Sequence, residues 1–317
     1  MGLIYKVFLK IFHKVWKNVE VEDQKRMKTL VLPDDVSFED FKYGEDDDPY
    51  HTFSIYWPKD KDLTKLPILI DIHGGAWAYG DKELNRPFCM TMAHRNLIVM
   101  GMSYRLVEGV QVNNQLEDII NSINGFVKVA KERKYNLNNV FLTGDSAGGY
   151  FALSLASLLD RKLINPILGL NLNIDFKGLI LNHPAFDFDI MGQTHFWYPL
   201  LFRAMFGKKY KKNPIYINTK NTKVLMDNVY LPPMLFITST GDDVMGEINI
   251  DVLKEVKRYY PNIEVINNDI DPKGHVYNVA YINSNSAIKT NDKISNFILS
   301  ISEKTLVCTG DLADDGL

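Results

Sequence analysis

The chain has 317 residues, 46% of them hydrophobic, and a formal net charge of −3. A chain of this length can bury about three quarters of its unfolded surface in one main domain. Its slightly negative net charge excludes the positive electrostatic potential that nucleic-acid binding requires. Its two cysteines, Cys89 and Cys308, are too few for a disulfide framework and lack the clustered spacing of a zinc site, so we expect a reducing, cytoplasmic compartment.

An amphipathic helix is predicted at residues 3–19, where apolar side chains recur at helical spacing and lysines lie on the other face. Two interpretations stay open: the helix packs on the body of the protein, or it lies as a basic amphipathic helix on a membrane surface. Because lysines interrupt the segment, neither a spanning helix nor a secretory signal is expected. An acidic stretch at 44–49 then ends this N-terminal arm, which we place at residues 1–45.

Short apolar runs and helical patterns alternate along the rest of the chain, as expected of an α/β domain with a mostly parallel central sheet flanked by helices. An alternating segment at 51–57 predicts the first strand. Nearly continuous apolar runs predict the central strands, at 66–73, 97–104, 139–143, 178–182, 234–238 and 262–266. Helical periodicity predicts helices at 112–134, 146–159, 247–259 and 283–302.

One interval breaks the alternation. Residues 188–230 are rich in aromatics and lysines and separate two strands that a short crossover normally joins. A long insertion in a compact domain is often a lid, so we expect a helical cap here. The main domain is therefore predicted at 46–187 and 231–303, with a flexible tail at 304–317.

A glycine-rich turn joins one of these strands to a helix at residues 144–148, with the sequence Gly-Asp-Ser-Ala-Gly. This pattern is typical of the turn that presents a serine nucleophile, here Ser146, in a strained backbone conformation that needs small neighbours. The N–H of Ala147 and the helix dipole then lie where an oxyanion develops. Asp145 is expected to support this turn.

A second glycine-rich loop, residues 73–77, ends the strand about 70 residues before Ser146. Only glycine lets backbone N–H groups approach a substrate closely, so Gly74 and Gly75 are predicted to complete an oxyanion hole with Ala147. His73 is expected to orient the loop through a hydrogen bond rather than to act as a base.

A serine hydroxyl needs a base, and the sequence offers His275 on a loop between the last predicted strand and the last helix. This position suits the chain order serine, acid, histidine. His183 closes a strand and suits a structural or pocket role, and His195 lies in the predicted cap.

Two neighbouring aspartates, Asp242 and Asp243, follow the penultimate strand, where the acid of such a triad belongs. One of them is expected to accept the imidazole N–H, and the other to structure the loop. We favour Asp242 as the acid, with Asp243 in the supporting role.

Taken together, the chain resembles the hormone-sensitive lipase-like branch of the α/β-hydrolases over roughly residues 50 to 300. The resemblance rests on several motifs in matching order: 73–77, Gly80-Asp81, 103–106, 116–118, 144–149 and Gly274-His275. It implies an α/β-hydrolase fold and a cofactor-free and metal-free hydrolase of short- to medium-chain carboxylic esters, under a cap built from the N-terminal arm and the insertion.

Several alternatives remain. A deacetylase, an arylformamidase-like enzyme or a peptidase would use the same triad on a different bond, and a noncatalytic ligand-binding module would keep the fold alone. A lipase working at a membrane surface is suggested by residues 3–19 and by the aromatics of the insertion. The expected partner is a small-molecule ester, and the sequence says nothing of oligomeric state.

Overall fold

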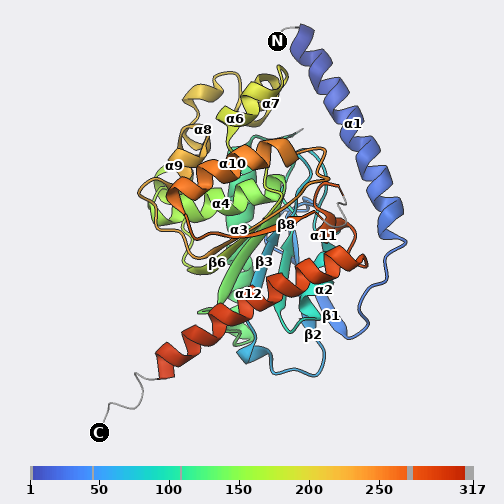
Figure 1. Cartoon of the computed structure of the whole chain (residues 1–317), viewed down its shortest axis with the longest axis vertical. Helices are drawn as coiled ribbons and strands as arrows, with labels where there is room; N and C mark the ends of the chain where they lie inside the picture. Colours follow the sequence, from blue (N-terminus) through green and yellow to red (C-terminus); the bar gives the residue numbers. More distant parts are fainter. Residues whose placement is uncertain (1–2, 45, 108, 270–273, 311–317) are drawn as a thin grey trace.

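The computed structural model describes residues 3–44, 46–107, 109–269 and 274–310. Its centre is an eight-stranded sheet with the order β1-β2-β4-β3-β5-β6-β7-β8 (Figure 1). The strands are β1 Val36–Lys42, β2 Thr52–Pro58, β3 Ile68–Ile72, β4 Ile98–Met102, β5 Val140–Asp145, β6 Phe176–Asn182, β7 Met234–Ser239 and β8 Glu264–Asn268. Strand β2 pairs antiparallel with β1 and β4, and the remaining pairs are parallel.

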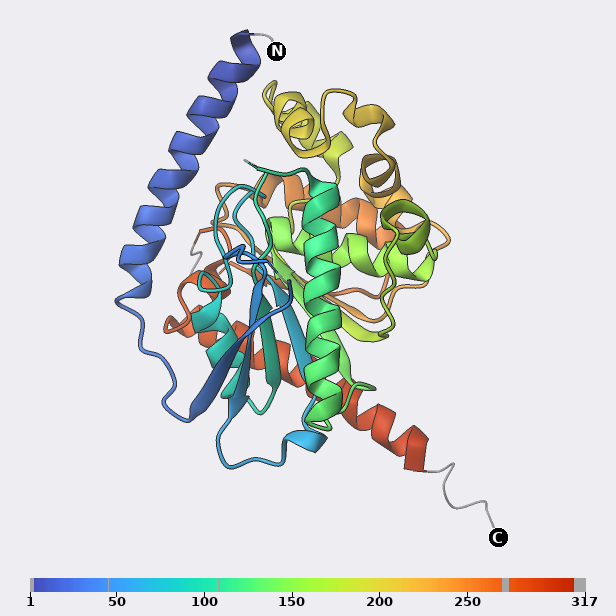
Figure 2. The same ribbon diagram turned by 180° about the vertical axis from the view of Figure 1, so that it is seen from behind.

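Helices cover both faces of this sheet, which is why its central strands are apolar on both sides. One face is packed by α2 Arg86–Ala93, α11 Tyr277–Ala280 and α12 Asn285–Gly310. The other is packed by α3 Val112–Glu132, α4 Ala147–Asp160 and α10 Gly246–Tyr259, with α3 in the foreground of Figure 2. The predicted fold class, a mostly parallel sheet flanked by helices, is confirmed.

The insertion at 188–230 forms a group of short helices above the carboxyl ends of the strands (Figure 1). They are α6 Phe188–Thr194, α7 Tyr198–Phe206, the 3-10 helix η2 Tyr210–Lys212, α8 Pro214–Thr219 and α9 Thr222–Met226. Their aromatic side chains pack on one another, with the rings of Phe188 and Phe202 4.9 Å apart. Two further short elements, η1 Leu63–Lys65 and α5 Ile164–Leu168, lie outside this group.

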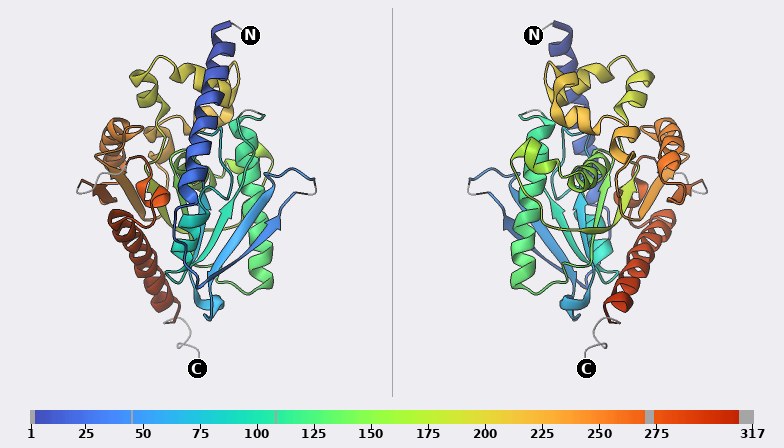
Figure 3. Two further views of the ribbon diagram at one scale, coloured as in Figure 1. Left: turned by 90° about the vertical axis from the view of Figure 1, so that its right-hand side faces the viewer. Right: turned by 90° about the vertical axis from the view of Figure 1, so that its left-hand side faces the viewer.

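The N-terminal helix α1, Leu3–Met27, runs along the outside of the molecule and passes close to α7 (Figure 3). Its inner face is held by aromatic contacts: Trp16 stacks on Tyr79 at 5.2 Å, and the guanidinium of Arg203 lies 4.4 Å from the ring centre of Tyr5. No helix in the described residues is both long and apolar enough to cross a membrane.

Two expected boundaries need correction. The arm predicted at 1–45 contains β1, which pairs with β2 and so belongs to the sheet. The sequence pattern did not predict this strand because an edge strand exposes most of its side chains and lacks a continuous apolar run. The tail predicted from residue 304 begins later, because α12 continues to Gly310. Residues 311–317, the rest of that tail, lie outside the described residues.

Candidate active site

Ser146 occupies the sharp turn between β5 and α4, with φ 50° and ψ −115°. Such a positive φ is strained for a residue with a side chain and lifts the hydroxyl above the sheet. The turn is kept by close packing: a side chain at Gly148 would collide with the carbonyl oxygen of Ile72. The N–H of Ser146 donates to the carbonyl of Asn182 at 2.9 Å, which ties the turn to the neighbouring strand.

An imidazole and a carboxylate lie together at the carboxyl ends of the strands. Nδ1 of His275 is 3.0 Å from Oδ2 of Asp242, and Oδ1 of that aspartate accepts the N–H groups of Val244 and Met245 at 2.9 and 2.8 Å. The Asp242 side chain is fully buried, whereas Asp243 is exposed. The geometry therefore gives Asp242 the position of a triad acid.

The charge state of Asp242 suits that position. Burial by itself raises the pKa of this carboxyl, but the hydrogen bond and the charge of His275, with the N–H of Met245, hold the pKa below its ordinary value. The carboxylate is thus ionised at neutral pH and fixes the imidazole with its Nδ1 proton toward the acid.

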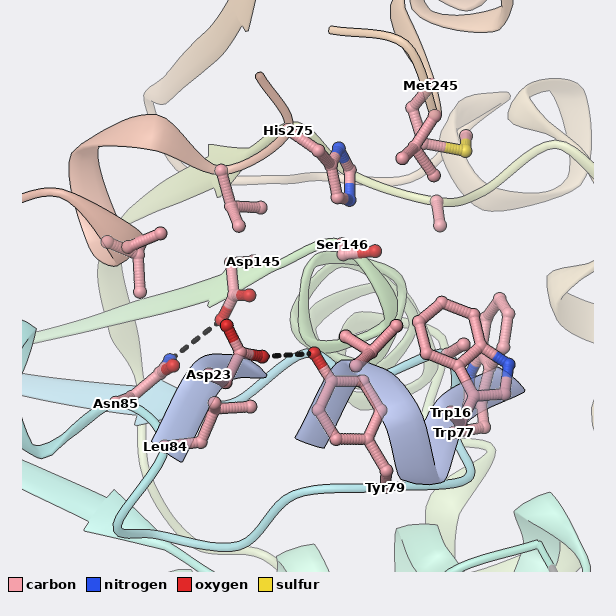
Figure 4. A pocket seen from close by; sticks show the side chains of 18 of the residues that line it. Trp16, Asp23, Trp77, Tyr79, Leu84, Asn85, Asp145, Ser146, Met245 and His275 are labelled. Carbon is pink, nitrogen blue, oxygen red and sulfur yellow. Dashed lines mark hydrogen bonds between the residues drawn. The ribbon is translucent and has the colours of Figure 1, made fainter. Parts of the chain in front are cut away.

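The other ring nitrogen of His275 has no hydrogen-bond partner within the described part of the chain. His275 and Ser146 line the same cavity, and in Figure 4 the imidazole points toward Ser146. Nε2 is thus available to accept a proton on the side where the serine lies.

The loop predicted to bind an oxyanion lies beside Ser146, where Gly75 and Ala76 line the cavity. Gly75 has φ 104°, and a side chain there would collide with the carbonyl oxygen of Tyr79. His73 is buried, with Nδ1 2.7 Å from the carbonyl oxygen of Gly74 and its ring stacked 4.3 Å from Tyr104. Burial lowers the pKa of His73 to about 4, so this ring is neutral and holds the loop.

The expectation for Gly74 needs correction. Its N–H donates to Oδ1 of Asp145 at 3.0 Å, so this donor is engaged inside the protein and not offered to a substrate. The loop turns after Gly74, which leaves Gly75 and Ala76 at the cavity. Sequence alone could not separate these consecutive residues, because the direction of each N–H depends on the local backbone.

Asp145 belongs to a buried polar group beneath this loop. Nδ2 of Asn85 donates to both Asp145 and Asp71, at 2.7 and 2.9 Å, and the thiol of Cys89 lies 3.7 Å from Asp71. Burial, and then the charge of Asp145, raises the pKa of Asp71 well above its ordinary value. Asp145, which also accepts the N–H of Gly74, connects this buried polar group to the loop at 73–77.

The two rival histidines occupy different surroundings. His183 is buried against the site, with its ring centre 5.7 Å from that of His275, and neither of its nitrogens has a partner among the residues described. Burial and the neighbouring His275 lower the pKa of His183 to about 3, so it remains neutral and packs against the ring of His275. His195 is exposed in the cap.

The cavity beside Ser146 has a volume of about 320 Å³, at the small end of ligand pockets. Most of its wall is apolar, and its larger parts come from the helix α1, the loop after Gly75, the cap and residues 275–281. From α1 come Phe12, Trp16, Val19, Asp23 and Arg26; the resemblance implied a cap built partly from the N-terminal arm, but not which of its residues reach the cavity. No local sequence pattern identifies these individual residues, since they precede Ser146 by more than 100 positions and meet it only through the tertiary fold.

No cluster of metal-ligating side chains is found within residues 3–44, 46–107, 109–269 and 274–310. The chemistry that the arrangement itself offers is that of a serine, a histidine and an aspartate beside an apolar cavity. Such a group can carry out nucleophilic attack on an acyl carbonyl.

Comparison with known proteins agrees with this geometry. The model of the family described as BD-FAE matches residues 53–254. Bovine arylacetamide deacetylase is 27% identical over 192 residues, which cover 56% of this chain and 45% of that protein. Probable carboxylesterase 5 of Arabidopsis thaliana is 30% identical over 38% of this chain and 40% of its own length. This chain spans less than half the length of the curated relatives that it matches.

Solved structures match over nearly the whole chain. The crystal structure of esterase B from Lactobacillus rhamnosis superimposes with a TM-score of 0.87 and 25% identity, over 98% of this chain and 99% of that one. A bacterial heroin esterase gives a TM-score of 0.66 at 17% identity, over 90% of each chain, and shares the fold.

Proposed function

This chain belongs to the BD-FAE family of α/β hydrolases, and on that footing we propose that it is a serine carboxylesterase acting on short- to medium-chain esters through an acyl-enzyme. The observation that carries the proposal is the Asp242–His275 pair beside Ser146, at the wall of one apolar cavity. The names of the relatives, among them carboxylesterases and esterase B, support the ester bond as the target.

The proposed reaction starts with attack of the Ser146 hydroxyl oxygen on the ester carbonyl carbon, while Nε2 of His275 takes the hydroxyl proton. The N–H groups of Gly75, Ala76 and Ala147 stabilise the negative charge on the carbonyl oxygen. Collapse of the tetrahedral intermediate breaks the bond to the alcohol oxygen, which receives the proton from His275. A water molecule, deprotonated by the same histidine, then releases the carboxylic acid and restores the serine.

The cavity supports a preference for small acyl groups. Aromatic side chains form part of its wall: Trp197 and Tyr198 come from the cap, and Trp77 comes from the loop after Gly75. A volume of about 320 Å³ can enclose a short acyl chain but not a long one.

A series of p-nitrophenyl esters from acetate to palmitate tests this proposal. We expect the highest kcat/KM at four to eight acyl carbons, because each methylene that fits the cavity gains roughly 0.8 kcal/mol from burial. We expect at least about a tenfold lower value for palmitate, because its chain fits only if the cap is displaced, at a cost of more than about 1.4 kcal/mol. Turnover of p-nitroacetanilide or a formanilide without turnover of any ester would contradict it and favour a deacetylase or arylformamidase-like activity.

We propose the cytoplasm as the compartment of this enzyme. The support is chemical: Cys89 is a free, buried thiol against Asp71. A chain with only two cysteines, one of them a free thiol, is typical of a reducing compartment.

Contact with a membrane through residues 3–19 is a second proposal, favoured by the outer face of α1. Four aliphatic side chains on successive turns stay exposed there: Ile4 at 76%, Val7 at 48%, Ile11 at 58% and Val15 at 49%. Exposed lysines run beside them, at Lys6, Lys10, Lys14 and Lys17, and this segment contains no acidic residue although the whole chain is negative. Aliphatic groups flanked by lysines suit the surface of an anionic bilayer, at about 1 kcal/mol per lysine.

Flotation with vesicles of phosphatidylcholine, with and without phosphatidylserine, tests the membrane contact. We expect the protein to float with the anionic vesicles at low salt, and replacement of the four aliphatic residues by glutamine to weaken binding at least about tenfold, since their burial in lipid is lost. The matched control replaces four similarly exposed aliphatic residues outside the segment 3–19 by glutamine: Val31, Ile217, Ile250 and Ile288. Equal flotation of both variants would rule out docking through α1.

A further inference from the structure

An ion pair from α1 lies at the wall of the mostly apolar cavity. Oδ1 of Asp23 accepts hydrogen bonds from Nη2 and Nε of Arg26 at 2.9 and 3.2 Å. Both residues line the cavity, and their side chains are 20% exposed for Asp23 and 16% exposed for Arg26. Oδ2 of Asp23 accepts the hydroxyl of Tyr79 at 2.9 Å, and Nη1 of Arg26 donates to the carbonyl of Ala280. We call Asp23, Arg26 and Tyr79 the polar corner.

The polar corner keeps hydrogen-bonding capacity for a ligand. A guanidinium has five N–H donors and a carboxylate about four acceptor sites, so the contacts within the described residues leave donors on Arg26 and an acceptor site on Asp23. Holding a charged pair in an apolar cavity has a desolvation cost, which a polar ligand group would offset. The complementary ligand therefore carries groups that both donate and accept, as hydroxyl groups do.

The place of the polar corner identifies which half of an ester it meets. His275 must pass its proton to the departing alcohol oxygen, so the alcohol lies on the side of the base. Ala280, which Arg26 contacts, belongs to the short helix that follows His275. In Figure 4, Asp23 lies on one side of Ser146, and Trp16 and Trp77 lie on the other. The aromatic side then holds the acyl chain.

We infer that the polar corner binds the alcohol part of the substrate and selects esters of polyhydroxy alcohols, such as glycerol, over esters of simple alkyl alcohols. This inference rests on the proposed esterase function and adds the class of alcohol to it. Hydrogen bonds to charged groups of this kind correspond to a preference of roughly tenfold or more in kcat/KM.

Glycerol monobutyrate and n-propyl butyrate form the test pair, since both carry a three-carbon alcohol and yield the same butyryl-enzyme. Because kcat/KM covers only binding and acylation, the common deacylation step does not enter the comparison. The two alcohols differ as leaving groups to the same extent in every variant, so the change of the kcat/KM ratio between native and variant protein reports the alcohol site. In the double variant Asp23→Leu, Arg26→Met, an apolar pair of similar volume replaces the ion pair without leaving a single buried charge. The ratio is expected to fall from roughly ten to about one.

The matched control is the neighbouring exposed pair on the same helix, Glu22 and Lys25, whose charged atoms are 2.7 Å apart. Glu22→Leu, Lys25→Met is expected to keep the ratio of the native protein. If the ion pair served only to hold α1 against the domain, the double variant would lose activity on both esters equally. The ratio of the two kcat/KM values would then be unchanged, and that result would overturn the inference. A native ratio near one would overturn it as well. Failure to hydrolyse either ester would instead remove the esterase proposal on which the inference depends.

Discussion

Ser146→Ala is expected to lower kcat for ester hydrolysis by on the order of a millionfold, because the nucleophile acts as a unit with its base and acid. The serine lies on a turn with φ 50°, beside the cavity that His275 also lines. Removing its hydroxyl leaves the turn and the core intact, so the thermal midpoint should stay within a few degrees of that of the native protein. Hydrolysis of p-nitrophenyl butyrate and thermal unfolding measure the two quantities.

The control for this variant is Ser154→Ala. Ser154 lies on the same helix α4 and is fully buried, but it does not line the cavity. Its loss should leave kcat within about threefold of the native value, as expected of a substitution away from the reacting atoms. If Ser146→Ala retained a tenth of the native activity, another residue would have to be the nucleophile.

Asp242→Asn is expected to lower kcat by roughly ten thousandfold, because a neutral amide can hold the imidazole in the wrong tautomer and does not stabilise its positive charge. The carboxylate concerned lies 3.0 Å from Nδ1 of His275, and its side chain is fully buried. The His275 contact holds its pKa below the ordinary value, so the loss should be similar across the neutral range, where the native carboxylate is ionised. Profiles of kcat from pH 6 to 9 for the native protein and for Asp242→Asn measure this loss.

Asp243→Asn is the matched control, since it makes the same chemical change at the adjacent, exposed position. Its kcat should stay within about threefold of the native value, as is usual for surface substitutions. If instead Asp243→Asn removed activity and Asp242→Asn retained it, the acid of the triad would be the other aspartate.

The central strands and the serine turn could be predicted from the sequence because their signals are local. A strand buried on both faces must be apolar along its length, and β3 to β7 lie within a few residues of their predicted positions. The turn at 144–148 can be recognised from its glycines, which close packing requires. Edge strand β1 and the short helix α2 were missed, since neither carries a periodic apolar pattern long enough to stand out.

The cap illustrates an intermediate case. Its existence follows from an insertion that is too long for a crossover. Its division into short helices depends on the hydrogen bonds that begin each helix and on side-chain packing. Asn213, for example, accepts the N–H of Ile215 at 2.8 Å and so begins α8, and Asp187 accepts that of Ile190 at 3.0 Å to begin α6.

What the sequence determined by itself is the chemistry that rests on neighbouring residues: the serine turn, the glycine loop and the type of fold. What only the tertiary structure decided is which distant groups share one cavity and which way each backbone N–H points. Asp242 faces His275 while Asp243 faces solvent, Gly74 donates to Asp145, and Asp23 of α1 reaches the wall beside Ser146. The reason is physical: local patterns fix backbone conformation within a few residues, whereas contacts between distant segments depend on how the whole core packs.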